Sequence, residues 1–137
     1  MRYNERLGYA DGEWQLVKTQ LKSILVETAR KEQLITYKDL SAGLGPERFP
    51  PNSEVLSALL YEVTREEFLN GKGLLTSVVV KSGQVPFPGD GFFKCAEGCG
   101  KKIYGRQKFW IRELRHLYSL HREYSKDAGK DKSYERV

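Results

Sequence analysis

The sequence predicts an α+β protein that is mostly helical: a winged-helix-like core of three helices, a small β-hairpin and a long C-terminal helix. Helical apolar spacing runs through the first half, a β-branched run covers Leu74–Lys81, and a long amphipathic pattern begins at Gly105. We expect one domain over residues 1–125, which opens with an irregular arm at residues 1–11. Residues 126–137 are charged and lack an apolar face, so we expect a mobile tail.

The first helix is predicted over Gly12–Gln33 from apolar residues at three-to-four spacing. These residues are Trp14, Val17, Leu21, Ile24 or Leu25, and Thr28 or Ala29. Thr36 is a good N-cap for a second, short helix, and Asp39 stands at its third position, as in a capping box. That helix is expected to stop near Gly43 and Gly45.

The third helix is predicted to begin after Asn52 or Ser53 and to end at Asn70–Gly71. Its apolar face consists of Val55, Leu56, Leu59, Leu60, Val63 and Phe68. Its acids are Glu54, Glu62, Glu66 and Glu67, against Arg65 alone. A helix that enters the major groove normally carries more basic or amide side chains, so the C-terminal helix is expected to supply much of any DNA contact. Glu62, Glu66 and Glu67 are interpreted as a solvated face rather than a catalytic or metal site.

The β-hairpin is predicted from a change in pattern after the third helix. Leu74–Lys81 is almost continuously apolar, which indicates a strand with both faces covered. Ser82–Gly83 is a turn signal, and Gln84–Phe87 is expected as a short return strand that its proline keeps at an edge.

Pro88–Gly91 is predicted to be a tight turn that leads into Phe92–Phe93 and a short helix ending at Gly98 or Gly100. Two interpretations of this turn remain open. Its glycines permit close backbone approach, and its amides can hold an anion. Alternatively, it is a structural turn that directs the two phenylalanines into the core, and this interpretation is favoured.

The C-terminal helix separates its charges. Residues 101–137 contain 11 Lys and Arg against 5 Asp and Glu, whereas residues 1–100 contain 12 against 13. Five cations fall within about 80° on a helical wheel, and three more extend the positive region at its start. The predicted nucleic-acid contacts are therefore Lys101, Lys102, Arg106, Lys108, Arg112, Arg115, Arg122 and Lys126, with Tyr104 and Tyr118 as stacking groups.

The opposite side of this helix is predicted to lie in the core. Trp110, Leu114 and Leu117 are expected to pack with Phe92–Phe93, above Val78 and Val80 of the strand. The reason is that the Pro88–Gly91 turn reverses the chain directly after the strand.

Composition limits the classes of protein. The chain has 137 residues, 39% of them apolar, with 30% charged, which suits one soluble domain. No apolar run approaches the ~20 residues of a membrane span, and no signal-peptide core is present, so a cytoplasmic protein is expected. No serine-triad order, P-loop or dinucleotide motif occurs, and we therefore expect neither an enzyme nor a cofactor.

A zinc site is a weak alternative. Cys95 and Cys99, with three residues between them, and His116 and His121, with four, fit finger-like limits. The central gap of 16 residues exceeds the spacing of about 12 in zinc fingers, and the two histidines point some 140° apart on a helix. The alternative, that the two cysteines line a short helix against the core, is favoured.

Two stretches are similar to the winged-helix domain of alkylguanine-DNA alkyltransferases. The run Ile35–Ser41 resembles the Thr-Tyr-Gly-Glu-Ile-Ala segment that opens this domain, and Val78–Gly83 resembles its His-Arg-Val-Val-x-x-Asp-Gly strand and turn. The resemblance covers residues 35–91 and implies a winged helix. The family's reactive Pro-Cys-His is Leu75-Thr76-Ser77 here, so alkyl-acceptor chemistry does not carry over.

A more specific resemblance is to small bacterial and phage proteins of unassigned function. The shared motifs are Thr-Tyr-x-x-Leu (residues 36–40), Leu-x-Ser-x-Val-Val-Val (74–80), Pro-Gly-x-Gly-Phe-Phe (88–93) and Phe-Trp-x-x-Glu-Leu (109–114). This resemblance implies a fold and no activity.

The sequence therefore predicts a non-enzymatic nucleic-acid-binding protein, with DNA favoured over RNA. The alternative is a protein-interaction or regulatory module, for which the acidic third helix and the basic C-terminal helix would suit association.

Overall fold

The computed structural model describes the backbone of residues 9–135 and the side chains of residues 9–122; the predicted arm therefore lies mostly outside the described residues. In order, the elements are the helix α2 (Asp11–Arg30), the strand β1 (Ile35–Thr36), the helices α3 (Tyr37–Leu44) and α4 (Glu54–Leu69), the 3-10 helix η1 (Leu75–Val78), the strand β2 (Val79–Val80), and the helices α5 (Asp90–Gly98) and α6 (Arg106–Glu135). The mostly helical α+β class is confirmed. No helix in the described part of the chain is long and apolar enough to cross a membrane.

The predicted helix starts are confirmed by their caps. The Thr36 and Ser53 hydroxyl oxygens each accept a hydrogen bond from the backbone amide three residues later, at 3.1 and 3.2 Å. Helix α2 stops at Arg30, three residues earlier than predicted. The reason is local: Glu32 adopts a φ of 52°, and the Gln33 amide turns back to bond the Thr28 carbonyl at 3.0 Å.

The predicted hairpin is wrong. Residues Val79–Val80 pair with Ile35–Thr36, and the two short strands run parallel. The first half of the predicted strand is η1, because the hydroxyl and the amide of Ser77 both donate to the Leu74 carbonyl, at 2.6 and 3.0 Å. Such local bonds draw the backbone out of a strand. Residues 74–80 are nevertheless buried throughout, as their apolar run indicates.

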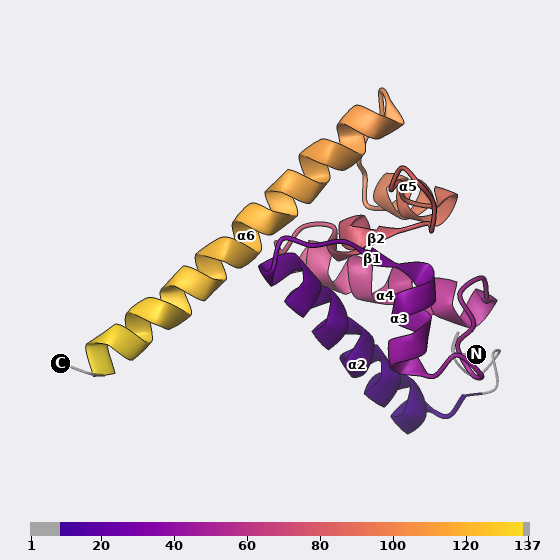
Figure 1. Cartoon of the computed structure of the whole chain (residues 1–137), viewed down its shortest axis with the longest axis horizontal. Coiled ribbons are helices and arrows are strands. Elements are labelled where there is room, and N and C mark those ends of the chain that lie inside the picture. The colour runs from indigo at the N-terminus through magenta and orange to yellow at the C-terminus, as the bar shows by residue number, and fades with distance from the viewer. Residues whose placement is uncertain (1–8, 136–137) are drawn as a thin grey trace.

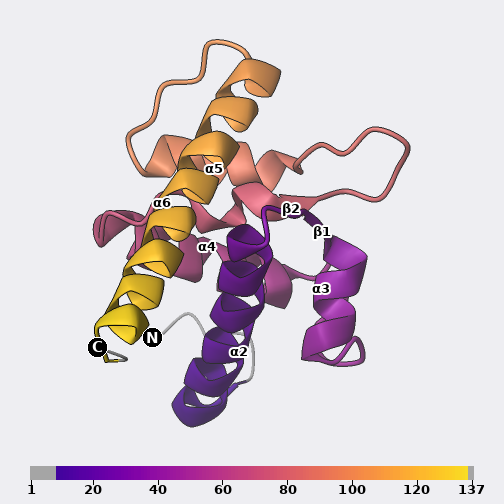
Figure 2. The ribbon, with the colours of Figure 1, turned by 60° about the vertical axis from the view of Figure 1, so that its left-hand side comes forward.

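Residues 84–87, predicted as a return strand, lie in a loop between β2 and α5 (Figure 2). One backbone bond, from the Lys81 amide to the Phe87 carbonyl at 2.9 Å, ties the two sides of this loop. Pro86 and Pro88 have no amide hydrogen to donate, and Val85 is 80% exposed. The segment therefore has neither the donors nor the covered face of a strand.

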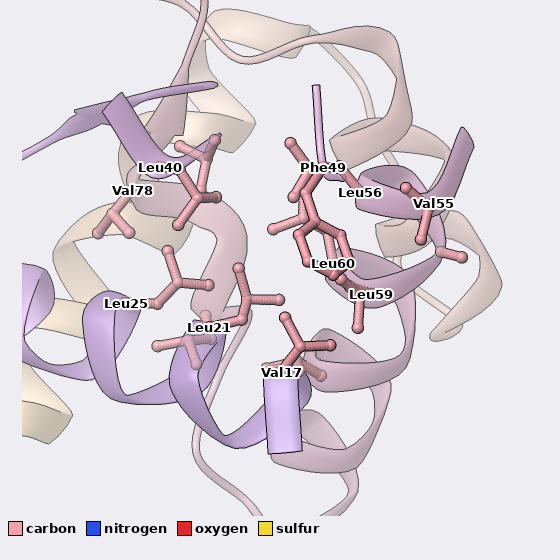
Figure 3. Packing of buried hydrophobic residues seen from close by; sticks show 14 of the residues in the cluster. Val17, Leu21, Leu25, Leu40, Phe49, Val55, Leu56, Leu59, Leu60 and Val78 are labelled. Atoms are coloured by element: carbon pink, nitrogen blue, oxygen red, sulfur yellow. The ribbon is translucent and has the colours of Figure 1, made fainter. Parts of the chain in front are cut away.

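The larger core cluster lies between α2, α4 and η1. Val17 and Leu21 project from α2 toward Leu59 and Leu60 of α4, and Leu25 lies on the side of Leu40 and Val78 (Figure 3). The helical spacing of the residues on α2 and α4 predicted their burial, and all of them are buried.

A second cluster joins α5, the start of α6 and β2. Its buried members are Leu74, Val80, Phe92, Phe93, Ala96, Phe109 and Trp110. The prediction that Trp110, the two phenylalanines and Val80 pack together is confirmed. Val78 and Leu117 belong to the larger cluster instead, because α6 passes from one cluster to the other and Leu114 contacts both.

Helix α6 is longer than predicted. It continues through Glu135 rather than ending near Ser125, since no proline interrupts it. Its C-terminal half stands apart from the other helices (Figure 1). The predicted mobile tail, residues 126–137, thus has a helical backbone as far as Glu135, and its side chains lie outside the described residues.

Candidate functional site

One side of α6 carries exposed cations. Lys108, Arg112 and Arg115 are exposed, and among the described side chains none of the three has an ion pair; we call them the α6 cationic face. Trp110 and Leu117 are buried on the other side. The helical wheel predicted this separation, because residues three, four and seven apart share one side of a helix.

Three other predicted contact residues are partnered by carboxylates. The ion pairs are Lys101 Nζ to Glu113 Oε1 at 3.1 Å, Arg106 Nη1 to Asp90 Oδ1 at 2.8 Å, and Arg122 Nη2 to Glu32 Oε1 at 2.5 Å. Lys102 is exposed, and Lys126 lies outside the described side chains. Three of the eight predicted contact residues therefore already have a carboxylate partner in the fold.

The two tyrosines predicted to stack on bases, Tyr104 and Tyr118, differ in how far they are available to a ligand. The Tyr118 hydroxyl donates to the Gln33 carbonyl at 2.6 Å, and burial together with nearby Glu32 raises the pKa of Tyr118 to about 12. Tyr118 is thus engaged in the fold. Tyr104 is 87% exposed and can meet a ligand.

A pocket of about 780 Å³ lies between the start of α3, one side of α4, η1 and the start of α5. Aromatic rings, a buried hydroxyl and two lysines contribute to its lining: Tyr37, Tyr61, Phe92, Thr76, Lys81 and Lys94. No motif in the sequence predicted this pocket, because its walls come from segments up to 58 residues apart. The available sequence signal is the Pro88–Gly91 turn, of which Gly89 and Gly91 line the pocket.

That turn forms part of the pocket wall. The Gly89 amide donates to the Tyr37 hydroxyl at 3.3 Å, and a Cβ at Gly89 would stand 3.0 Å from that oxygen. Gly89 therefore allows the backbone to approach the tyrosine closely. Burial raises the pKa of Tyr37, so its hydroxyl keeps its proton at neutral pH. The favoured interpretation is also confirmed, since Phe92 and Phe93 are buried directly after the turn.

The mouth of the pocket is positive. Lys81 and Lys94 are exposed, and neither has an ion pair in the described part of the chain. Both lie within electrostatic range of Asp90, whose pKa is lowered first by the hydrogen bond from Arg106 and then by Arg106's charge and the two lysines. Glu62 also lines the pocket, so the three cations Lys81, Lys94 and Arg106 stand against two carboxylates, Asp90 and Glu62, and this region keeps a small net positive charge.

The acids of α4 form the predicted solvated face only in part. The indole N–H of Trp14 donates to Glu62 at 2.7 Å, and Lys18 contacts Glu66 at 2.7 Å. Glu67 is only 4% exposed and pairs with Lys22 at 3.3 Å. Glu62 and Glu67 face α2 and therefore lie partly inside the domain, whereas Glu66 pairs with Lys18 and remains exposed.

Thr76 lines the pocket, at the position where the resemblance to alkylguanine-DNA alkyltransferases would put a cysteine. The Thr64 hydroxyl donates to the Thr76 hydroxyl oxygen at 2.9 Å. Cys95 lines the same pocket, but burial raises its pKa to about 12, so it remains a thiol at neutral pH. Neither residue offers a thiolate for alkyl transfer.

The candidate zinc ligands are not brought together. Cys95 and Cys99 lie at the end of α5, His121 is buried in the middle of α6, and His116 is exposed beside Gly73. No group of three or more metal-ligating side chains occurs among the described residues.

His121 is expected to make stability depend on pH. Burial lowers its pKa, although Glu67 opposes the shift. Because the unfolded chain binds a proton more readily than the native state, the free energy of unfolding should fall as the pH drops below about 6.5. Urea unfolding at a series of pH values should show this fall in the parent protein and a smaller one in His121→Gln.

The exposed His116 provides the matched control for that measurement. His116→Gln should retain the pH dependence of the parent protein. An equal flattening in both variants would contradict the assignment to His121.

Comparisons with known protein families, with curated proteins and with solved structures give no match to this chain.

Proposed function

We propose that this protein binds nucleic acid, DNA in preference to RNA, and that it holds one unstacked base in the pocket while its cations contact phosphates. The observation that carries the proposal is the pocket itself: aromatic walls with two lysines at the mouth that have no ion pair among the described side chains. An aromatic base that is flanked by negatively charged phosphates is the ligand that such a pocket complements.

The pocket has a suitable size and lining for a base. Its volume of about 780 Å³ lies within the range of about 300–1,000 Å³ that small-molecule sites occupy. Tyr37, Tyr61 and Phe92 provide aromatic surface, and a base stacked on such a ring gains about 1–3 kcal/mol. Proteins that accept an unstacked base enclose it in this way and hydrogen-bond its edge. Thr76 and Tyr37 supply hydroxyls for that purpose.

The cations suit the phosphates on either side. Lys81 and Lys94 stand at the mouth of the pocket, near Asp90. Arg106, the ion-pair partner of Asp90, connects this region with the start of α6. The α6 cationic face extends the positive surface. The preference for DNA rests on the resemblance to alkylguanine-DNA alkyltransferases. Without a thiolate in the pocket, we propose binding without alkyl transfer and without a cofactor.

The alternative, a protein-interaction module, was suggested by the acidic third helix. In the structure Glu62, Glu66 and Glu67 have basic or indole partners on α2, so they do not form a free acidic surface. No specific observation therefore favours this alternative.

Filling the pocket should weaken binding. Ser57 is exposed and lines the pocket, so Ser57→Trp places a large ring in the opening without disturbing the core. Fluorescence anisotropy with a labelled single-stranded oligonucleotide should show a Kd raised by about 5- to 150-fold, which corresponds to the loss of one stacked base. The slope of log affinity against log salt should stay unchanged, because no phosphate contact is removed.

Leu16→Trp is the matched control, since Leu16 is 65% exposed on α2 and does not line the pocket. It should bind like the parent protein. A 2-aminopurine base in the oligonucleotide should change its fluorescence with the parent protein and not with Ser57→Trp. Equal binding by all three proteins contradicts the base pocket, and no binding by the parent at low salt contradicts the proposed function.

A further inference from the structure

Two thiols lie one helical turn apart beside the pocket. Cys95 belongs to α5 and Cys99 is its C-cap, where the Cys99 amide donates to the Cys95 carbonyl at 3.0 Å. Because residues one turn apart share one side of a helix, the two thiols are neighbours on α5. Cys95 is buried in the pocket wall, whereas Cys99 is half-buried and can be reached from solvent.

The surroundings give the two thiols different reactivity. Arg65 lies on α4 with its exposed guanidinium in electrostatic range of both sulfurs, and it donates to the Gly98 carbonyl at 3.5 Å. Of the two thiols, Cys99 is the one that solvent reaches, so a dissolved oxidant meets it first. Burial raises the pKa of Cys95 to about 12, so Cys95 remains protonated.

We propose that Cys95 and Cys99 form a hydroperoxide-sensitive pair that closes to an intrachain disulfide and thereby alters the wall of the pocket. The Cys99 thiolate attacks the terminal oxygen of a hydroperoxide, the O–O bond breaks, and the alkoxide or hydroxide that leaves takes up a proton. Cys99 is now a sulfenic acid, oxidised by two electrons. The Cys95 sulfur then attacks the Cys99 sulfur, and the Cys95 proton leaves with the hydroxyl group as water.

Disulfide formation must deform the end of α5. On a regular helix the Cβ atoms of residues one turn apart are about 5–6 Å apart, whereas a disulfide requires about 3.5–4.5 Å. Cys99 already ends the helix, and Gly100 follows with a φ of +88°, so this end can move toward Cys95. Because Cys95 forms part of the pocket wall, the movement reaches the ligand site. This last step, the effect on ligand binding, rests on the proposed function.

The chemistry is tested on the whole reduced chain with a small excess of hydrogen peroxide, followed by intact mass measurement. The parent protein should lose the mass of two hydrogens and both free thiols. Cys95→Ser should stop at a sulfenic acid on Cys99 that dimedone captures, and Cys99→Ser should keep a reduced Cys95 at the same dose. A sulfinic acid on Cys99 beside an intact Cys95 thiol overturns the proposal, as does equally fast oxidation of Cys99→Ser.

The link to the pocket is tested separately by anisotropy with the labelled oligonucleotide. Oxidation should raise the Kd by about fivefold or more, the lower bound for losing one stacked base, and dithiothreitol should reverse it. The double variant Cys95→Ser/Cys99→Ser should not respond to peroxide. A disulfide that forms with no change in Kd overturns the link. Failure of the reduced protein to bind would overturn the proposed function, whereas the mass measurement would still decide the disulfide.

Discussion

Replacing Trp110 by alanine is expected to lower the free energy of unfolding by about 3–5 kcal/mol, as for other large-to-small changes in a core. Trp110 is 7% exposed in the second cluster, and its ring packs edge-on against Phe87 with the centroids 5.7 Å apart. Its indole N–H also donates to the Ser77 carbonyl at 2.8 Å. In Trp110→Ala this buried carbonyl oxygen would lose that hydrogen bond, which adds to the cost. Urea unfolding followed by circular dichroism measures the effect.

Two surface variants of the same helix are the controls. Arg112→Ala and Arg115→Ala should change stability by no more than about 0.5 kcal/mol, because both side chains are exposed and have no ion pair among the described residues. Trp110→Phe should retain much of the packing and lose the hydrogen bond, at a cost between those of the other variants. Arginine variants as damaged as Trp110→Ala would show that the cationic face has a structural role.

Removing the whole α6 cationic face should weaken binding most at low salt. In the triple variant Lys108→Ala/Arg112→Ala/Arg115→Ala, the slope of log affinity against log salt on duplex DNA should fall by about 2.7, which is about 0.9 for each lost phosphate contact. Anisotropy titrations over a range of salt concentrations measure this slope. The fluorescence of 2-aminopurine in the saturated complex should not change, because the pocket is intact.

A charge-matched control separates the cationic face from the net charge of the protein. The control replaces three cations that lie outside α6 and that pair with carboxylates: Arg30, Lys31 and Arg48. Their replacement by alanine removes the same amount of positive charge as the first triple variant. This variant should keep most of the parent slope. An equal fall in both triple variants would mean that overall charge, rather than α6, governs binding.

The sequence by itself determined the features that depend on near neighbours. The starts of α3 and α4 are set by Thr36 and Ser53, whose hydroxyls bond amides three residues away, so both could be predicted. The burial of Leu21 and Leu25 and the exposure of Arg112 follow from helical periodicity in the same way. Each of these depends on residues within one or two helical turns.

The tertiary structure decided what depends on distant residues. The apolar run that ends in Val79–Val80 could be matched with any buried segment, and its parallel partner Ile35–Thr36 lies 44 residues earlier. The pocket requires Tyr37 to meet Gly89 across the fold, and the ion pair between Arg106 and Asp90 joins two helices that no local pattern links. Local patterns define which side of an element is buried and carry no information on which other element covers it. That choice is made only when the side chains of all elements pack together.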